Sequence, residues 1–70
     1  MSEDNNVELK KLIKSYGLTL DDVSAYTDYS LDMVKAWISK PDSARYRIMQ
    51  DRALRLLKYE IQARDLPLKS

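Results

Sequence analysis

Cysteine and histidine are both absent from the 70-residue chain. Their absence excludes disulfides, thiol or imidazole catalysis and the common zinc sites, so we expect no metal and no other cofactor. A hydrophobic core in a chain this short is near the lower limit of what stabilises a fold alone. Regular packing of helices, with or without a partner subunit, is the remaining source of stability.

Long apolar runs are also absent. No segment has the roughly 20 apolar residues that a transmembrane helix needs. The N-terminal stretch MSEDNNVE is acidic, unlike the basic start of a secretory signal. We therefore expect a soluble, intracellular protein with no membrane partner.

Glycine occurs once, at Gly17, and no segment alternates apolar and polar residues as a strand does. Apolar residues recur at helical spacing instead. This pattern predicts one all-α domain over residues 1–70, a small bundle of four to five helices with a flexible N-terminus over residues 1–6. The first helix is expected to be capped by Asn5 or Asn6 and to end at Gly17. Its buried stripe is expected to contain Val7, Leu9, Leu12, Ile13 and Tyr16.

Two short helices are expected over residues 19–39, separated by the stretch TDYS. Thr19 and Ser30 are suited to cap the two N-termini, and Asp28 is expected to adopt a positive φ in the turn. Pro41 ends the second helix, because the residue before a proline avoids the α region. In this helix we expect Val34, Trp37 and Ile38 to point inward, and Asp32, Lys35, Ala36 and Ser39 to point outward.

A last helix is expected over residues 50–64, followed by a tail over residues 65–70. Its helical spacing predicts a buried stripe of Ala53, Leu54, Leu57 and Ile61. Two ion pairs between residues four apart are expected on its surface, Asp51–Arg55 and Glu60–Arg64. Further apolar side chains either complete the core or form a two-fold interface: Leu56, Tyr59, Leu66 and Leu68.

The net charge is only +1, but the charged residues are distributed unevenly along the chain. Residues 1–34 carry a net charge of −4, whereas residues 35–70 carry +5. The positive half begins within the second short helix and continues through a loop in which two arginines flank a tyrosine. Such a distribution indicates either a site for a polyanion or an ordinary solvated surface.

Two short helices joined by a tight turn are the sequence form of a helix-turn-helix. Residues 18–40 resemble the helix-turn-helix of the phage repressor/Cro (XRE) family. The stretch SARYRIMQDRALRLLKYE is similar to the loop and closing helix of short phage-type regulators, including repressors encoded beside anti-CRISPR genes. The resemblance covers about residues 9–60. Six residues carry its first part without a gap: Leu18, Thr19, Val23, Ser30, Val34 and Trp37.

The resemblance implies a sequence-specific transcriptional regulator that binds double-stranded DNA. It implies a phage or prophage repressor that occupies an operator as a homodimer in the cytoplasm of a bacterial host, at its nucleoid, without a small-molecule ligand. In this family the first short helix braces against the phosphates and the second enters the major groove. The residues expected at the DNA are Thr19, Ser30, Leu31, Asp32, Lys35, Ala36, Ser39, Lys40, Ser43, Arg45, Tyr46 and Arg47.

Several positions within residues 18–40 depart from the family pattern. The family's glutamine at the start of the bracing helix is Leu20, and its turn glycine is Asp28. The first exposed residue of the recognition helix, often arginine or glutamine, is Leu31, which could contact a thymine methyl group. Asp32 either accepts from a cytosine amino group or only complements the helix dipole.

The basic residues nearby favour DNA. Lys35 could reach guanine or phosphate, and Arg45 and Arg47 suit phosphate through their planar donor forks. Tyr46 either donates to a phosphate or anchors the loop.

An alternative class is a protein-interaction module on the same scaffold, which binds a host or phage protein. The leucine and aspartate at the start of the recognition helix favour this alternative, together with Asp21, Asp22 and Asp28. An enzyme is not expected, because no general acid–base pair can be named without histidine or cysteine.

Overall fold

The computed structural model describes residues 2–69, with side chains from residue 4 onward. The described chain is all-helical and contains no strand. Its four helices are α1 (Ser2–Tyr16), α2 (Leu20–Thr27), α3 (Leu31–Ile38) and α4 (Asp51–Ala63). The prediction of a small all-α bundle is therefore confirmed. Among residues 2–69, no helix combines the length and the apolar character needed to cross a membrane.

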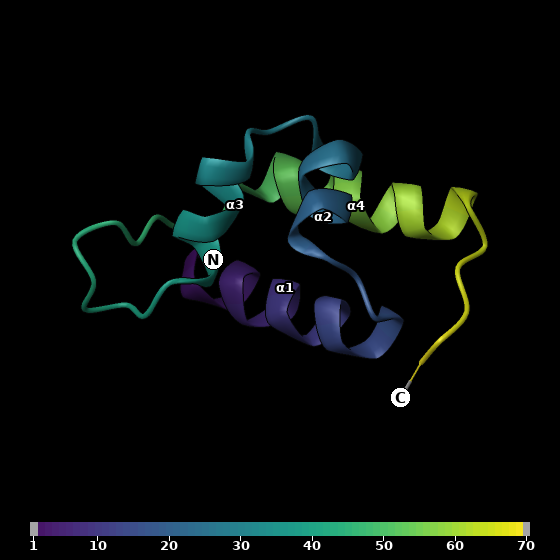
Figure 1. Ribbon diagram of the computed structural model, residues 1–70, viewed down its shortest axis with the longest axis horizontal. Helices are drawn as coiled ribbons and strands as arrows, with labels where there is room; N and C mark the ends of the chain where they lie inside the picture. The colour runs from purple at the N-terminus through teal and green to yellow at the C-terminus, as the bar shows by residue number, and fades with distance from the viewer. Residues whose placement is uncertain (1, 70) are drawn as a thin grey trace.

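The four helices form a small body with extents of 35 × 23 × 22 Å. In Figure 1, α1 runs along one side, α2 and α4 lie above it, and α3 lies toward one end of the body. The connection between α3 and α4 projects from the end of the molecule near α3. We call this connection, residues 40–50, the arginine loop.

The start of α1 differs from the prediction. The helix begins at Ser2, so residues 2–6 are helical where we expected a flexible N-terminus over residues 1–6, and Asn5 and Asn6 are not helix caps. Residue 1 of that expectation lies outside the described residues. Both asparagines lie within α1, and their side chains bond to parts of the chain 31 to 46 residues away. Asn6 is 3% exposed and takes an inward position of the helix. Val7 is therefore rotated away from the core and 51% exposed, so its predicted burial was wrong.

The turns around α2 follow from local chemistry. The Thr19 hydroxyl accepts from the Asp22 amide and the Asp22 carboxylate accepts from the Thr19 amide, each at 3.0 Å, which makes a reciprocal capping box. Asp28 ends α2 with φ 63°, and Gly17 ends α1 with φ 62°. Both left-handed residues were predicted correctly.

The two ends of α3 are set by particular residues, and the helix between them is therefore short. The Ser30 hydroxyl accepts from the Met33 amide at 3.2 Å and caps the first turn, as predicted. The last helical residue is Ile38, three residues before Pro41, and Ser39 is already extended. Within α3, Val34 is 0% and Trp37 is 1% exposed, which confirms that these two residues point inward.

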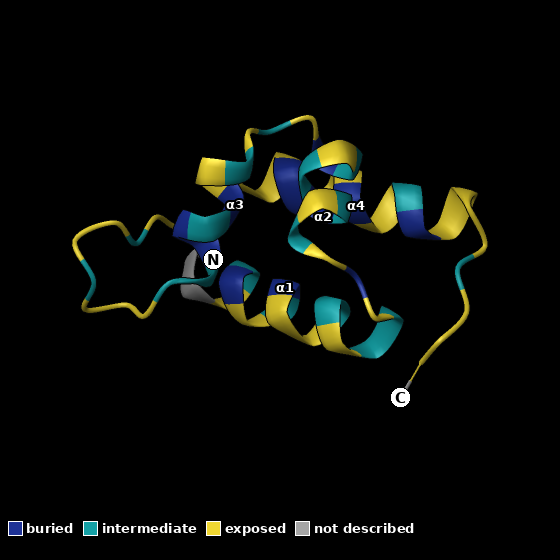
Figure 2. Ribbon diagram, viewed as in Figure 1, coloured by how far each residue is buried: buried dark blue, intermediate teal, exposed yellow. Residues whose placement is uncertain are grey.

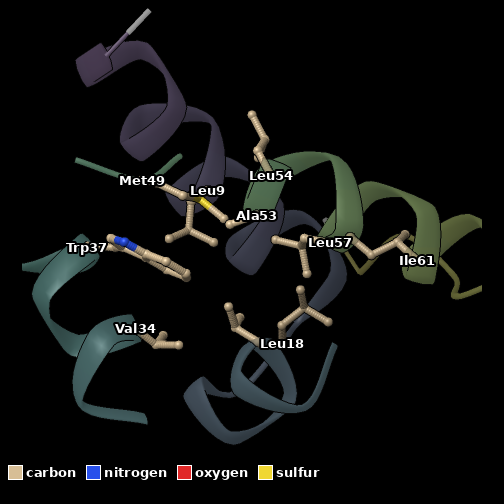
Figure 3. Packing of buried hydrophobic residues seen from close by; sticks show 10 residues of the cluster. Leu9, Leu18, Val34, Trp37, Met49, Ala53, Leu54, Leu57 and Ile61 are labelled. Carbon is tan, nitrogen blue, oxygen red and sulfur yellow. The ribbon is translucent and has the colours of Figure 1, made fainter. Parts of the chain in front are cut away.

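The core lies between all four helices, with Leu18 from the turn after α1 and one residue from the arginine loop (Figure 3). Trp37 of α3 and Leu9 of α1 point toward one another in this view. Met49, the loop's contribution, is fully buried. The ring of Tyr29, in the turn before α3, meets that of Trp37 edge to face at 5.1 Å between centroids. These contacts hold the turn and α3 on the rest of the body.

The closing helix α4 buries one side, as predicted, and leaves the other to solvent (Figure 2). Its buried residues are Ala53, Leu54, Leu57 and Ile61. The predicted ion pair Glu60–Arg64 is present at 2.9 Å. Asp51 does not pair with Arg55 as predicted, because its carboxylate accepts from Asn5 at 2.6 Å.

The tail returns toward the end of α1, where the Lys69 amide donates to the Ser15 carbonyl (Figure 1). Leu66 packs against the core, so it completes the monomer. Three other apolar side chains of α4 and the tail remain exposed: Leu56 at 39%, Tyr59 at 64% and Leu68 at 67%.

Candidate functional site

The candidate site consists of the solvent side of α3 and the arginine loop beside it. Because Val34 and Trp37 are buried, the opposite side of α3 faces outward. Asp32 on that side is exposed, whereas Lys35 and Ser39 are half-buried. We call these three residues the outer face of α3. Their predicted orientation agrees with the structure.

Ala36 is a correction to the prediction. We expected it at the outer surface, but it is only 8% exposed. The arginine loop folds back against α3 at this point, and the Arg47 amide donates to the Ala36 carbonyl at 3.2 Å. The loop backbone thus covers Ala36 and leaves it little surface to offer a ligand.

The arginine loop has its own internal order. Its first turn is closed by the Ser43 amide, which donates to the Lys40 carbonyl at 2.9 Å. A second turn is closed by the Tyr46 amide on the Ser43 carbonyl at 3.1 Å, while the Ser43 hydroxyl accepts from the Arg45 amide at 3.3 Å. Ser43 is therefore a turn residue. Tyr46 is half-buried within the loop.

The basic side chains of the site have no acidic partner among the side chains that the structure describes. Lys40, Arg45 and Arg47 are exposed. Within residues 4–69, no carboxylate lies within 4.0 Å of their charged nitrogens or of the Lys35 nitrogen. The Arg47 guanidinium donates to two backbone carbonyls of its own loop, at 2.8 and 3.2 Å. Four cationic groups are therefore available to an anionic partner.

An open hollow separates α3 from the arginine loop. It is lined by Ser30, Asp32, Met33, Ala36, Arg45 and Arg47. One carboxylate, that of Asp32, thus shares the hollow with two guanidinium groups without forming an ion pair in the described chain. The hollow has a positive wall on the loop side and an acid on the α3 side.

The remaining predicted residues lie at helix starts. Thr19 and Ser30 use their hydroxyls as caps, so their contact to an anion would run through backbone amides of the first turn. Leu31 is half-buried at the start of α3. Thr19 lies at the far end of α2, about 12 Å along its axis from the turn before α3. Ten of the twelve predicted residues keep exposed or half-buried surface at or beside the site. Thr19 is exposed but lies at the far end of α2, and Ala36 is largely covered.

Two residues of structural importance to the site were missed. Asn6 bonds to Trp37, Arg47 and Met49, and Asn5 bonds to Met49 and Asp51. The sequence does contain one indication that such a donor is needed. Pro41 has no amide to donate to the Trp37 carbonyl four residues earlier. A buried carbonyl without that donor needs another one, and asparagine is a residue that can supply it.

Comparison with protein-family models, with curated proteins and with solved structures gave no match to this chain. The function is therefore inferred from the residues and geometry of the site.

Proposed function

We propose that the chain is a double-stranded DNA-binding regulator and that α2, residues 28–30 and α3 form its helix-turn-helix. One observation carries the proposal: the outer face of α3 lies beside a loop whose exposed cations have no carboxylate partner among residues 4–69. DNA is a polyanion, and neutralising its phosphates supplies much of the affinity of a DNA-binding protein.

The dimensions of the helix pair support the proposal. Two helices of eight residues each are joined by three residues, with a left-handed Asp28 at the start of the turn. This arrangement is typical of a helix-turn-helix. The α-helix is about 10–12 Å across with its side chains, and the major groove is about 12 Å wide. Trp37 and Val34 fix the inner side of α3, so its outer face is the side that would enter the groove.

The residues divide into two roles. Lys35 on α3 is within reach of base edges or a phosphate, and Asp32 one turn earlier can accept from a cytosine amino group. Arg45 and Arg47 on the loop would bind phosphates on the flank of the groove, where a planar guanidinium donates two parallel hydrogen bonds. Phosphate contacts set affinity and register, whereas the two α3 residues would set sequence preference.

A homodimer completes this proposal, because one short recognition helix reads few base pairs. Paired half-sites about one helical turn apart are the usual solution. The exposed Leu56 and Tyr59 of α4, with Leu68 of the tail, are the apolar surface proposed for the second copy. The dimer would act as a repressor by occupying a promoter. Sedimentation of the chain with and without duplex DNA tests the dimer, and a monomer under both conditions would exclude it.

A protein partner is the second candidate. The observation that favours it is the composition of the hollow, where Asp32 and the 37% exposed Met33 lie together and Ala36 is covered. An acid and a methionine suit a protein surface better than a phosphate backbone.

Salt dependence separates the two candidates. Duplexes should first be selected from a random library, and the affinity of the best one then measured from low to physiological salt. If a dimer neutralises about eight phosphates, log K falls against log salt with a slope of about −7. A slope near zero, or no duplex selected, would contradict DNA binding and favour the protein partner.

A further inference from the structure

The arginine loop is held from two sides. On one side the Arg47 amide donates to the Ala36 carbonyl of α3. On the other side Asn6 of α1 donates to the Arg47 carbonyl at 2.8 Å, and its side-chain oxygen accepts from the Met49 amide at 2.8 Å. The backbone of Arg47 is thus bonded through both its amide and its carbonyl, to two different helices.

The same asparagine also completes the end of α3. The Trp37 carbonyl would receive the amide of residue 41 in a longer helix, but Pro41 has no amide hydrogen. Asn6 supplies the missing donor, because its second amide hydrogen bonds to the Trp37 carbonyl at 2.8 Å. One buried amide group therefore joins α1, the end of α3 and the exit of the loop.

Asn5 extends this anchor toward α4. Its amide donates to the Met49 carbonyl at 2.9 Å and to the Asp51 carboxylate at 2.6 Å. Met49 is thereby bonded at its amide by Asn6 and at its carbonyl by Asn5. The two asparagines together set where the arginine loop leaves the body and where α4 begins.

We propose that Asn6, supported by Asn5, is a positioning residue that sets the arginine loop against α3 for DNA binding. This inference rests on the proposed function. With 3% of its surface exposed, Asn6 cannot touch a duplex. Its effect on binding must therefore run through the loop and its arginines.

The test compares Asn6→Ala with Ile61→Ala. Ile61 is 5% exposed and lies in α4 near the tail, so its truncation destabilises the fold without touching the loop. Amide hydrogen exchange is measured for Arg47 and Met49, with Leu57 as the reference for the whole core. In Asn6→Ala we expect the protection of Arg47 and Met49 to fall about tenfold more than that of Leu57. In Ile61→Ala all three should fall by the same factor.

Duplex affinity supplies the second arm. Asn6→Ala should weaken binding relative to Ile61→Ala about tenfold per subunit, or about 100-fold for a dimer, as expected for the loss of one charge-assisted hydrogen bond per chain. In a chain that already carries Arg45→Ala and Arg47→Ala, the same substitution should change affinity less than twofold. A purely structural role for Asn6 predicts the same loss in both backgrounds.

The outcomes are distinguishable. Equal loss of protection at Arg47, Met49 and Leu57 in Asn6→Ala, or additive losses of affinity, would overturn the positioning role. If the unaltered chain binds no duplex, the proposed function fails, and the exchange measurement alone decides whether Asn6 positions the loop. If Asn6→Ala does not fold, Asn5→Ala takes its place. Asn5→Ala removes only the part-buried bond to the Met49 carbonyl and the exposed bond to the Asp51 carboxylate. It should still raise amide hydrogen exchange at Arg47 and Met49.

Discussion

Asp32 lies on the outer face of α3, where an acid opposes an approaching phosphate. If α3 enters the groove, the Asp32 carboxylate comes within about 6 Å of DNA charge. The Coulomb energy of two like charges at that distance is about 0.7 kcal/mol in water and about 3 kcal/mol at an effective dielectric of about 20. Because Asp32 is exposed, we take a value of about 1 kcal/mol per subunit. Asp32→Asn should therefore raise affinity for unselected duplexes about fivefold per subunit, or about 30-fold for a dimer.

The assay is fluorescence anisotropy with an unselected duplex and with the selected one. Asp65→Asn is the matched control, because it changes the net charge equally and lies two residues after α4, whose end is at the opposite end of the molecule from α3 (Figure 1). On the selected duplex, asparagine in place of Asp32 should also move the preference at the contacted position from cytosine toward adenine. If Asp32→Asn leaves the affinity for unselected duplexes unchanged or lowers it, and Asp65→Asn has the same effect, the outer face of α3 does not meet DNA.

The remaining predictions concern binding roles and local stability. Lys35→Ala should relax sequence preference, whereas Arg47→Ala should weaken all duplexes alike and lower the salt slope by about one per subunit, or about two for a dimer, both measured by the same anisotropy titrations. Ser30→Ala removes the cap of α3 and should lower the free energy of unfolding by about 1 kcal/mol, seen as a melting point lower by about 4–8 °C. Asp28→Gly relieves the positive φ of 63° and should raise the free energy of unfolding by up to about 1 kcal/mol, and a lower melting point would contradict that explanation.

The local features of the fold could be predicted from the sequence because their causes are local. The caps at Thr19 and Ser30 bond to amides three residues ahead, and the turn at Asp28 needs only a residue that tolerates a positive φ. The inward stripe of α4 follows from helical spacing alone. None of these features depends on how distant parts of the chain meet.

The features that were missed depend on contacts between distant residues. Asn6 bonds across 31 to 43 residues, and no periodicity distinguishes it from a helix cap. Its inward position also sets the rotation of α1 and exposes Val7. Ala36 is covered only because the arginine loop turns back to bond its carbonyl. The path of a loop of eleven residues is a tertiary property, so the shape of the candidate site could not be predicted from its residue types.

The measurement that tests the central claim most directly is an NMR titration of the isotope-labelled chain with its selected duplex at about 50 mM salt. If the outer face of α3 and the arginine loop bind DNA, amide shifts should change over residues 30–36, at residue 40 and over residues 42–47. The solvent side of α1 should stay unchanged. Shift changes confined to α1 or α4, or none at a duplex excess, would contradict the claim.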